Sequence, residues 1–225
     1  MVGTTGTGKS TAIRELLDGA LGRGDRAVIA DPDGGYPNRF YDRSRGDVIL
    51  NPFDPRAYTW DLYGELSQSH DVEQLARSLI PDHDGADKSW RGYARTFFTA
   101  VVRQTNDAGI KDLAELYRLL TSASTDELRI LTQGTPAQPF LEGGNERMFG
   151  SIRSVTGASL TALDYLSTQT GPPVSVRDWV RTGRGVLFLP YQANEIAALR
   201  SIISAWLRLA IFQTMSGGEG DQRLW

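Results

Sequence analysis

The sequence contains no cysteine and only two histidines among its 225 residues. Without cysteine, the chain cannot form disulfides, a cysteine-ligated zinc site or a thiol nucleophile, and its composition suits a cytosolic compartment. Neither His70 nor His83 has a partner at the spacing that metal ligands require, so we assign them no chemistry. The chemistry of this chain must therefore come from other residue types.

A long uncharged apolar run is also missing. The most apolar segment, residues 196–212, is interrupted by Arg200 and Arg208 and falls short of the ~20 apolar residues that a bilayer-spanning helix needs. We therefore predict a buried core helix there and no transmembrane segment. A net charge of −3 excludes attraction of nucleic acid by overall charge, so any DNA contact requires a local basic patch. With 40% hydrophobic and 23% charged residues, the composition fits one or two globular domains.

The most informative segment present is a complete G-x-x-x-x-G-K-[ST] phosphate-binding loop, which opens a helical pattern. Glycines in such a loop adopt positive φ and let successive amides point at one anion. Lys9, the predicted catalytic residue, is expected to reach the β and γ phosphates, and the Ser10 hydroxyl to bind Mg²⁺. The helix predicted from about Ser10 to Leu21 directs its N-terminal amides at the same anion. The predicted nucleotide-binding residues are Gly3, Thr4, Thr5, Gly6, Thr7, Gly8, Lys9, Ser10 and Thr11.

The order of apolar patterns predicts an α/β fold with an all-helical insertion. Short apolar runs ended by turn residues or proline predict strands at 27–31, 47–52 and 185–190. A long helix is predicted at 194–214, and Leu224 and Trp225 begin another apolar run. An insertion of about 100 residues, a plausible domain size, contains no convincing strand. Its predicted helices lie at 72–79, 89–104, 112–120, 125–131 and 146–166. Strands alternating with helices around this insertion indicate a parallel sheet.

Five features in this order resemble the coupling proteins of conjugative type IV secretion, the TraD/TrwB family. They are the phosphate loop, the turn Asp31-Pro32-Asp33-Gly34, the run 48–54 followed by Trp60, the helical insertion, and the helix sequence at 199–207. The loop alone would indicate only a P-loop NTPase, whereas the ordered set covers essentially the whole chain and is considerably more specific.

The resemblance implies a RecA-like nucleotide-binding core, an α/β parallel sheet with flanking helices, into which an all-α domain is inserted. We accordingly assign residues 1–66 and 171–225 to the nucleotide-binding domain and residues 67–170 to the insertion. The family implies ATP and Mg²⁺ as cofactors, a homo-hexameric ring at the cytoplasmic face of the bacterial inner membrane, and single-stranded DNA as cargo. Relaxosome proteins and the secretion channel are the implied partners, and ATP hydrolysis would drive DNA translocation.

The resemblance further implies that this chain is an internal fragment cut at both ends. In the family, two transmembrane helices and the first core strand precede the loop. The acidic Walker B strand follows, and Leu224 is expected to begin it. We therefore expect negligible ATPase activity from the isolated chain, because the acid that binds the Mg²⁺ water would be missing. Steady turnover would instead place Asp31 in the metal site.

Asp31 ends the first complete strand and has two possible roles. The apolar run 27–31 has the form of a Walker B motif, so Asp31 could support the nucleotide site. Alternatively, it only closes a strand at the carboxyl edge of the sheet. In the RecA-like layout implied by the resemblance, the Mg²⁺ acid lies on a later strand.

Four basic residues share one face of the helix predicted at 89–104: Lys88, Arg91, Arg95 and Arg103. The opposite face is apolar and contains Trp90, Tyr93, Ala94, Phe97 and Val101. Such a pattern is typical of a core-packed helix with a solvated face. It also predicts possible DNA contacts, which would be salt-dependent and largely independent of base sequence.

Two other functions are compatible with the motifs. One is another DNA-translocating P-loop ATPase, of the chromosome-segregation or pilus-biogenesis type, although the helical insertion argues against it. The other is a non-hydrolytic module that binds nucleotide or DNA, which is how the isolated chain could behave.

Overall fold

The computed structural model describes residues 8–82, 88–217 and 223–225. Its main sheet has three parallel strands in the order β1 (Ala27–Asp31), β5 (Val186–Pro190), β2 (Val48–Ile49). The backbone of the last three residues lies along the free side of β1, where the Trp225 amide donates to Arg26 O at 2.9 Å. The predicted strands are confirmed, but β2 is shorter than predicted. Leu50 N still donates to Phe188 O at 2.9 Å, and Pro52, which has no N–H, then takes the chain out of the ladder.

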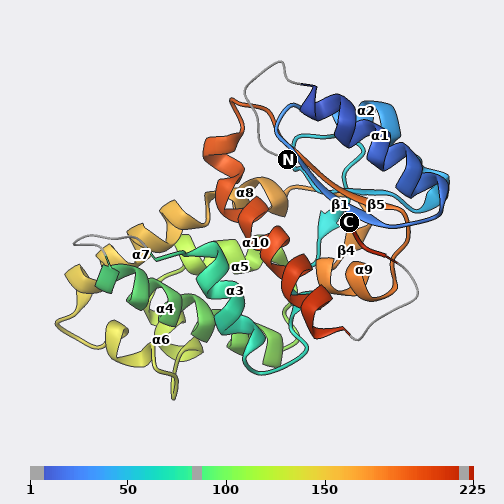
Figure 1. Cartoon of the computed structure of the whole chain (residues 1–225). Coiled ribbons are helices and arrows are strands. Elements are labelled where there is room, and N and C mark those ends of the chain that lie inside the picture. The colour runs from blue at the N-terminus through green and yellow to red at the C-terminus, as the bar shows by residue number, and fades with distance from the viewer. Residues whose placement is uncertain (1–7, 83–87, 218–222) are drawn as a thin grey trace.

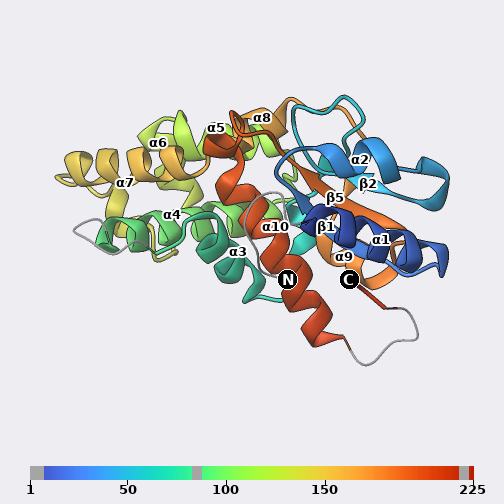
Figure 2. The same cartoon turned by 45° about the horizontal axis from the view of Figure 1, so that its top comes forward.

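Helices cover both faces of this sheet, and further helices extend to one side of it (Figure 1). The helices are α1 (Lys9–Gly22), α2 (Gly35–Phe40), α3 (Asp71–Leu79), α4 (Lys88–Asp107), α5 (Leu113–Thr121), α6 (Thr125–Leu131), α7 (Glu146–Ser159), α8 (Thr161–Ser167), α9 (Val176–Thr182) and α10 (Ile196–Ser216). Both Figure 1 and Figure 2 show α3–α7 as a helical lobe on one side of α10 and the sheet with α1 and α2 on the other. Among the described residues from 71 to 170, no strand occurs, as predicted.

The central strand β5 is buried along its whole length and serves two cores. Side chains of successive strand residues point to opposite faces. Val186 and Phe188 pack with α1 and α2 residues such as Leu17 and Phe40, whereas Leu187 and Leu189 belong to the larger core shared with α10. Such continuous burial is typical of a parallel strand with helices on both faces.

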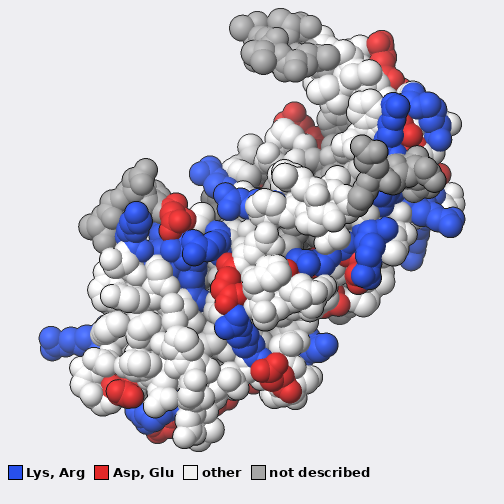
Figure 3. Space-filling model, turned by 60° about the horizontal axis from the view of Figure 1, so that its bottom comes forward, with Lys and Arg blue, Asp and Glu red and all other residues white. Residues whose placement is uncertain are grey.

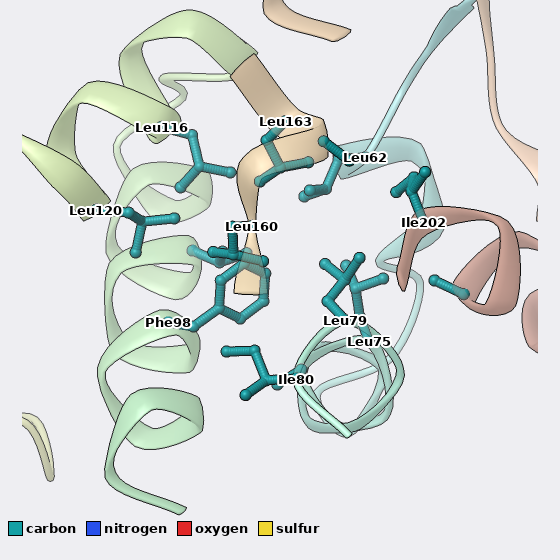
Figure 4. Close-up of a cluster of buried hydrophobic side chains, with 14 of the residues drawn as sticks. Leu62, Leu75, Leu79, Ile80, Phe98, Leu116, Leu120, Leu160, Leu163 and Ile202 are labelled. Atoms are coloured by element: carbon teal, nitrogen blue, oxygen red, sulfur yellow. The ribbon is translucent and has the colours of Figure 1, made fainter. Parts of the chain in front are cut away.

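The helical lobe has a continuous apolar core. Figure 4 shows side chains converging from α3, α4, α5, α8 and α10, among them Leu75, Phe98, Leu116, Leu163 and Ile202, all of them buried. Removing this much apolar surface from water is the main favourable term for the lobe. Because Ile202 of α10 joins the same cluster, the lobe is packed directly onto the helix that also covers the sheet.

The single helix predicted at 146–166 is wrong, because the chain bends at Leu160. This residue has φ −107° and ψ 15°, and its amide donates to both Thr156 O and Gly157 O. Leu160 and Leu163 are buried in the lobe core. The bend lets α7 pack against α4 while α8 packs against α5, which one straight helix could not do. Tyr93, expected on the apolar face, is 39% exposed and meets Trp90 and Phe140 edge-on at the lobe surface.

The two ends of the lobe are joined at one junction. Strand β3 (Thr59–Trp60) enters the lobe and pairs in parallel with β4 (Pro173–Val174), which leaves it. Trp60 is fully buried and packs edge-on against Trp206 of α10 with ring centroids 6.0 Å apart. Trp60 therefore packs where the chain enters the lobe, against the helix that also covers the sheet.

A buried carboxylate completes this junction. Glu65, 1% exposed, accepts hydrogen bonds from Trp60 Nε1 at 2.9 Å, Ser175 Oγ at 3.2 Å, Val176 N at 2.6 Å and Arg177 N at 3.0 Å. Burial raises the pKa of the Glu65 carboxyl above its usual range, and these donors oppose that shift because they stabilise the charged form. The negative charge also lies at the N-terminus of α9, which favours anions.

Helix α9 was not predicted from the sequence. Its cap is nevertheless visible there, since Ser175 is followed by Asp178 at the spacing of an N-terminal cap, and Ser175 Oγ accepts from Asp178 N at 3.1 Å. Helix α10 is long and apolar enough to cross a membrane by length and composition, with mean hydropathy 1.4. Core helices pass the same test, and buried Leu199, Ile202 and Trp206 pack α10 into the protein core, as predicted.

Candidate nucleotide-binding site

The start of α1 is open to an incoming anion. Gly8, the N-cap, has φ 77° and ψ 10°, a left-handed conformation that favours glycine, and no side chain caps the helix there. Gly8, Ser10 and Thr11 are exposed, and Gly8 O accepts the Ala12 amide at 3.0 Å. The first amides of a helix have no partner within it. Helix amides at this end therefore remain available for phosphate oxygens. Residues Gly3–Thr7, the Lys9 side chain and His83 lie outside the described part of the chain.

The start of α1 lies at the carboxyl edge of the parallel sheet. A tight turn through Gly24, with φ 83°, connects α1 to β1, so the two elements run in opposite directions. The Arg14 guanidinium lies 5.8 Å from the ring centre of Tyr36, which follows β1 by five positions. Because ligands of open α/β sheets bind at the carboxyl ends of the strands, this is the expected side for a nucleotide.

The carboxyl ends of β2 and β5 are tied together by polar side chains. Asn51, after β2, donates through Nδ2 to Pro190 O at 2.9 Å and to Glu195 Oε2 at 3.3 Å. Its Oδ1 accepts from Phe53 N at 2.8 Å, and Glu195 Oε2 accepts from Gln192 N at 3.0 Å. The sequence patterns predicted no role for Asn51 or Glu195. The Asn-Pro pair that ends the strand was a visible signal for a structured turn.

Asp31 shapes the turn that follows β1. Its carboxylate is 1% exposed and accepts from Asp33 N at 3.3 Å and Tyr36 N at 2.7 Å. Both oxygens are therefore used by backbone amides, which orders the turn and starts α2. This geometry favours the second of the two predicted roles, closure of a strand at the carboxyl edge. Among the residues described, no cluster of three or more His, Asp or Glu could hold a metal ion.

We expect Asp31→Asn to reduce stability more than nucleotide affinity. Asparagine replaces one of the two carboxylate oxygens with an NH2 group, which cannot accept a hydrogen bond, so one of the two backbone N–H groups loses its acceptor. A buried donor left unpaired costs about 1–3 kcal/mol. The free energy of unfolding, measured by urea denaturation, should fall by that amount, and Asp33→Asn, an exposed control in the same turn, should change it little. A folded Asp31→Asn chain that has lost nucleotide affinity would instead place Asp31 in the nucleotide site.

The predicted DNA-contacting residues on α4 are largely engaged within the protein. Arg95 forms an ion pair with Asp82 at 2.7 Å and donates to Ile80 O, and Arg103 pairs with Glu73 and donates to Ser69 O. Arg91 reaches Pro81 O at 3.4 Å, and Lys88 is exposed. On the face drawn in Figure 3, basic and acidic side chains lie beside one another in several places. The arginines thus hold α4 against α3, and their contact with DNA stays a prediction.

Comparison with known proteins decides the family. The sequence profile of the type IV secretion-system coupling protein DNA-binding domain matches residues 1–225. The chain belongs to this family. As a coupling protein it is similar to the coupling protein TraD of Escherichia coli (strain K12), with 35% identity over 231 residues that cover 99% of this chain and 32% of TraD.

Solved structures of the coupling protein TrwB have the same fold. TrwB in complex with ADP and Mg²⁺ is 32% identical, with a TM-score of 0.84 over 99% of this chain and 53% of that chain. TrwB with a non-hydrolysable ATP analogue gives the same identity and TM-score and is covered to 54%. The coupling-protein chain described here thus spans about a third of TraD and about half of these TrwB chains. The RecA-like α/β core with an all-α domain, predicted from the sequence, is confirmed.

Proposed function

We propose that this coupling-protein chain is the ATP-binding motor region that links the relaxosome to the type IV secretion channel. The observation that carries the proposal is the uncapped start of α1 behind Gly8, at the carboxyl edge of a parallel sheet and directly after a phosphate-loop sequence. The structures of TrwB in complex with ADP and Mg²⁺ and with an ATP analogue support nucleotide binding.

The residues present suit a triphosphate. Lys9 and the loop amides, from Gly3 to Gly8, would hold and neutralise the phosphates, and the Ser10 hydroxyl would hold Mg²⁺, with Thr11 beside it in the exposed first turn. Phosphoryl transfer depends on positioning and charge neutralisation more than on covalent chemistry by the protein. Hydrolysis of ATP would supply the free energy for movement of DNA.

The assembled protein is proposed to be a homo-hexamer at the cytoplasmic face of the bacterial inner membrane, with single-stranded DNA as cargo. The family description as a DNA-binding domain supports the cargo, and TraD and TrwB support a role in conjugation. We propose residues 67–170 as the inserted all-α domain and residues 1–66 and 171–225 as the nucleotide-binding domain. The pairing of β3 with β4 supports this division, because both crossings between the two parts then lie side by side.

Lys9→Ala tests the proposal. We expect the dissociation constant for MgATP to rise about 10- to 100-fold, because hydrogen bonds to charged groups contribute about 1.5–3 kcal/mol. Isothermal titration with a non-hydrolysable ATP analogue would measure it. Lys111→Ala, an exposed lysine of the helical lobe, is the matched control and should bind as the unchanged chain does. Equal affinity for both variants, or no nucleotide binding by the unchanged chain, would contradict the proposal.

A further inference from the structure

A groove of about 520 Å³ lies between α10, the end of α3, the start of α4 and the end of α7. Three arginines line it: Arg91, Arg200 and Arg208. Five serines line it as well: Ser78, Ser154, Ser159, Ser201 and Ser204. The other lining residues are apolar, and no carboxylate lines the groove among the residues that the structure describes. Figures 1 and 2 show α10 and α3 side by side, and residues of both helices line the groove.

The positive charge of this arginine–serine groove is not compensated within the described chain. On the helical lobe, Arg95, Arg103 and Arg129 each pair with a carboxylate. By contrast, Arg200 and Arg208 are exposed and form no ion pair with any residue that the structure describes. Among the described residues, Arg91 reaches only the Pro81 carbonyl, at 3.4 Å, and its buried Nε has no partner. Such a groove concentrates anions.

We propose that the arginine–serine groove binds the phosphodiester backbone of a single DNA strand. The proposal rests on the proposed function, in which DNA is the cargo, and it moves the DNA contact from the ion-paired side chains of α4 to the face of α10. Guanidinium and hydroxyl groups are both common donors to phosphate oxygens. Ser201 and Ser204 lie between Arg200 and Arg208 on α10 and can donate to the same backbone, whereas the hydroxyls of Ser78 and Ser159 already donate to Gln74 O and Val155 O.

The spacing of the donors suits an extended strand. Arg200 and Arg208 lie on one face of α10, ~12 Å apart along the helix axis by the helical rise, so they can contact different phosphates. Ala197, Ser201 and Ser204 lie on the same face, and their small side chains leave room above the helix. Since no aromatic side chain lines the groove among the described residues, we expect backbone contacts that are largely independent of base sequence.

The test compares two double variants that each remove two positive charges, Arg200→Ser with Arg208→Ser, and Arg95→Ser with Arg103→Ser. Binding to a fluorescein-labelled oligothymidylate of about 20 nucleotides is measured by anisotropy at several salt concentrations. For the first variant we expect at least a ~10-fold loss of affinity and a salt slope smaller by ~1.4, because each phosphate contact on a single strand contributes ~0.7. For the second we expect an unchanged slope. Equal losses from both variants, or no oligonucleotide binding by the unchanged chain, would overturn the proposal.

A label within the groove gives a readout that does not depend on lost binding. Because the chain has no cysteine, Ser204→Cys can carry a single environment-sensitive fluorophore, with Ser151→Cys on the exposed side of α7 as the control. Oligothymidylate should change only the Ser204→Cys signal, and unlabelled oligothymidylate, but not polyglutamate, should compete. Displacement by polyglutamate would indicate an acidic peptide and overturn the proposal. If the unchanged chain does not bind MgATP, that result would count against the proposed function and not against DNA binding in the groove.

Discussion

Replacing Glu65 with alanine is expected to lower the free energy of unfolding by about 3–5 kcal/mol, because each buried donor left without a partner costs about 1–3 kcal/mol. The carboxylate accepts hydrogen bonds from Trp60 Nε1 and from the Val176 and Arg177 amides. It therefore connects β3 to the start of α9 at the junction of the lobe. Alanine would leave a buried indole N–H and the first amides of α9 without an acceptor.

Urea denaturation followed by tryptophan fluorescence would measure this loss, since Trp60 and Trp206 both lie at the junction. Glu142→Ala, an exposed glutamate in the loop before α7, is the matched control and should change stability little. Glu65→Gln keeps one acceptor oxygen, so its free energy of unfolding should lie between those of Glu65→Ala and Glu142→Ala. Burial raises the pKa of Glu65 because it makes the charged form less stable. If Glu65→Ala is as stable as the control, the free-energy cost of burying this charge cancels the stabilisation from its four hydrogen bonds, and the prediction is wrong.

Asp47→Ala is expected to be almost as damaging, and the chain contains a matched surface pair to compare with it. Asp47 is fully buried and forms an ion pair with Arg45 two residues before it, at 2.6 Å. It also accepts from Val186 N, at the start of the central strand, and from Asp42 N. The hydrogen bonds that the Arg45 guanidinium donates to the Asp47 carboxylate raise the pKa of Arg45. Breaking a buried pair costs about 3–5 kcal/mol.

The surface counterpart is Asp54 with Arg56, at 2.7 Å and also two residues apart, but with 42% of the arginine side chain exposed. Surface pairs contribute about 0–1 kcal/mol. In thermal unfolding we expect Asp47→Ala to lower Tm by roughly 6–20 °C and Asp54→Ala by less than ~4 °C, at about 2–4 °C per kcal/mol for a chain of this size. Similar small shifts for both would contradict the importance assigned to Asp47.

The close contact between Asp47 and Gly185 explains why position 185 requires glycine, which local sequence patterns do not explain. Gly185 has φ 69°, and a Cβ there would lie 2.2 Å from Asp47 Oδ1. The carboxylate therefore occupies the space that any other side chain would need. This requirement arises only when residues 47 and 185 meet across the sheet, so local turn rules do not predict it.

Local patterns were enough for most elements. Apolar runs predicted β1 and β5, and helical spacing predicted α6 at its observed bounds and α3, α5 and α10 within about two residues, the usual uncertainty of helix ends. The Ser175–Asp178 cap of α9 was visible but not used, and the Asn-Pro pair at Asn51 was used only to end the strand. The break at Leu160 had no such signal, because it depends on which neighbours α7 and α8 pack against.

The sequence by itself determined the phosphate loop, the α/β order with its helical insertion, and the family to which these point, because each depends on residues that are close along the chain. Only the tertiary structure decided the state of the charged side chains. Arg95 and Arg103 meet Asp82 and Glu73 across a helix contact, whereas Arg200 and Arg208 face an open groove. The carboxylates that compensate Arg95 and Arg103 are distant from them in sequence, so folding alone brings these pairs within ion-pair distance.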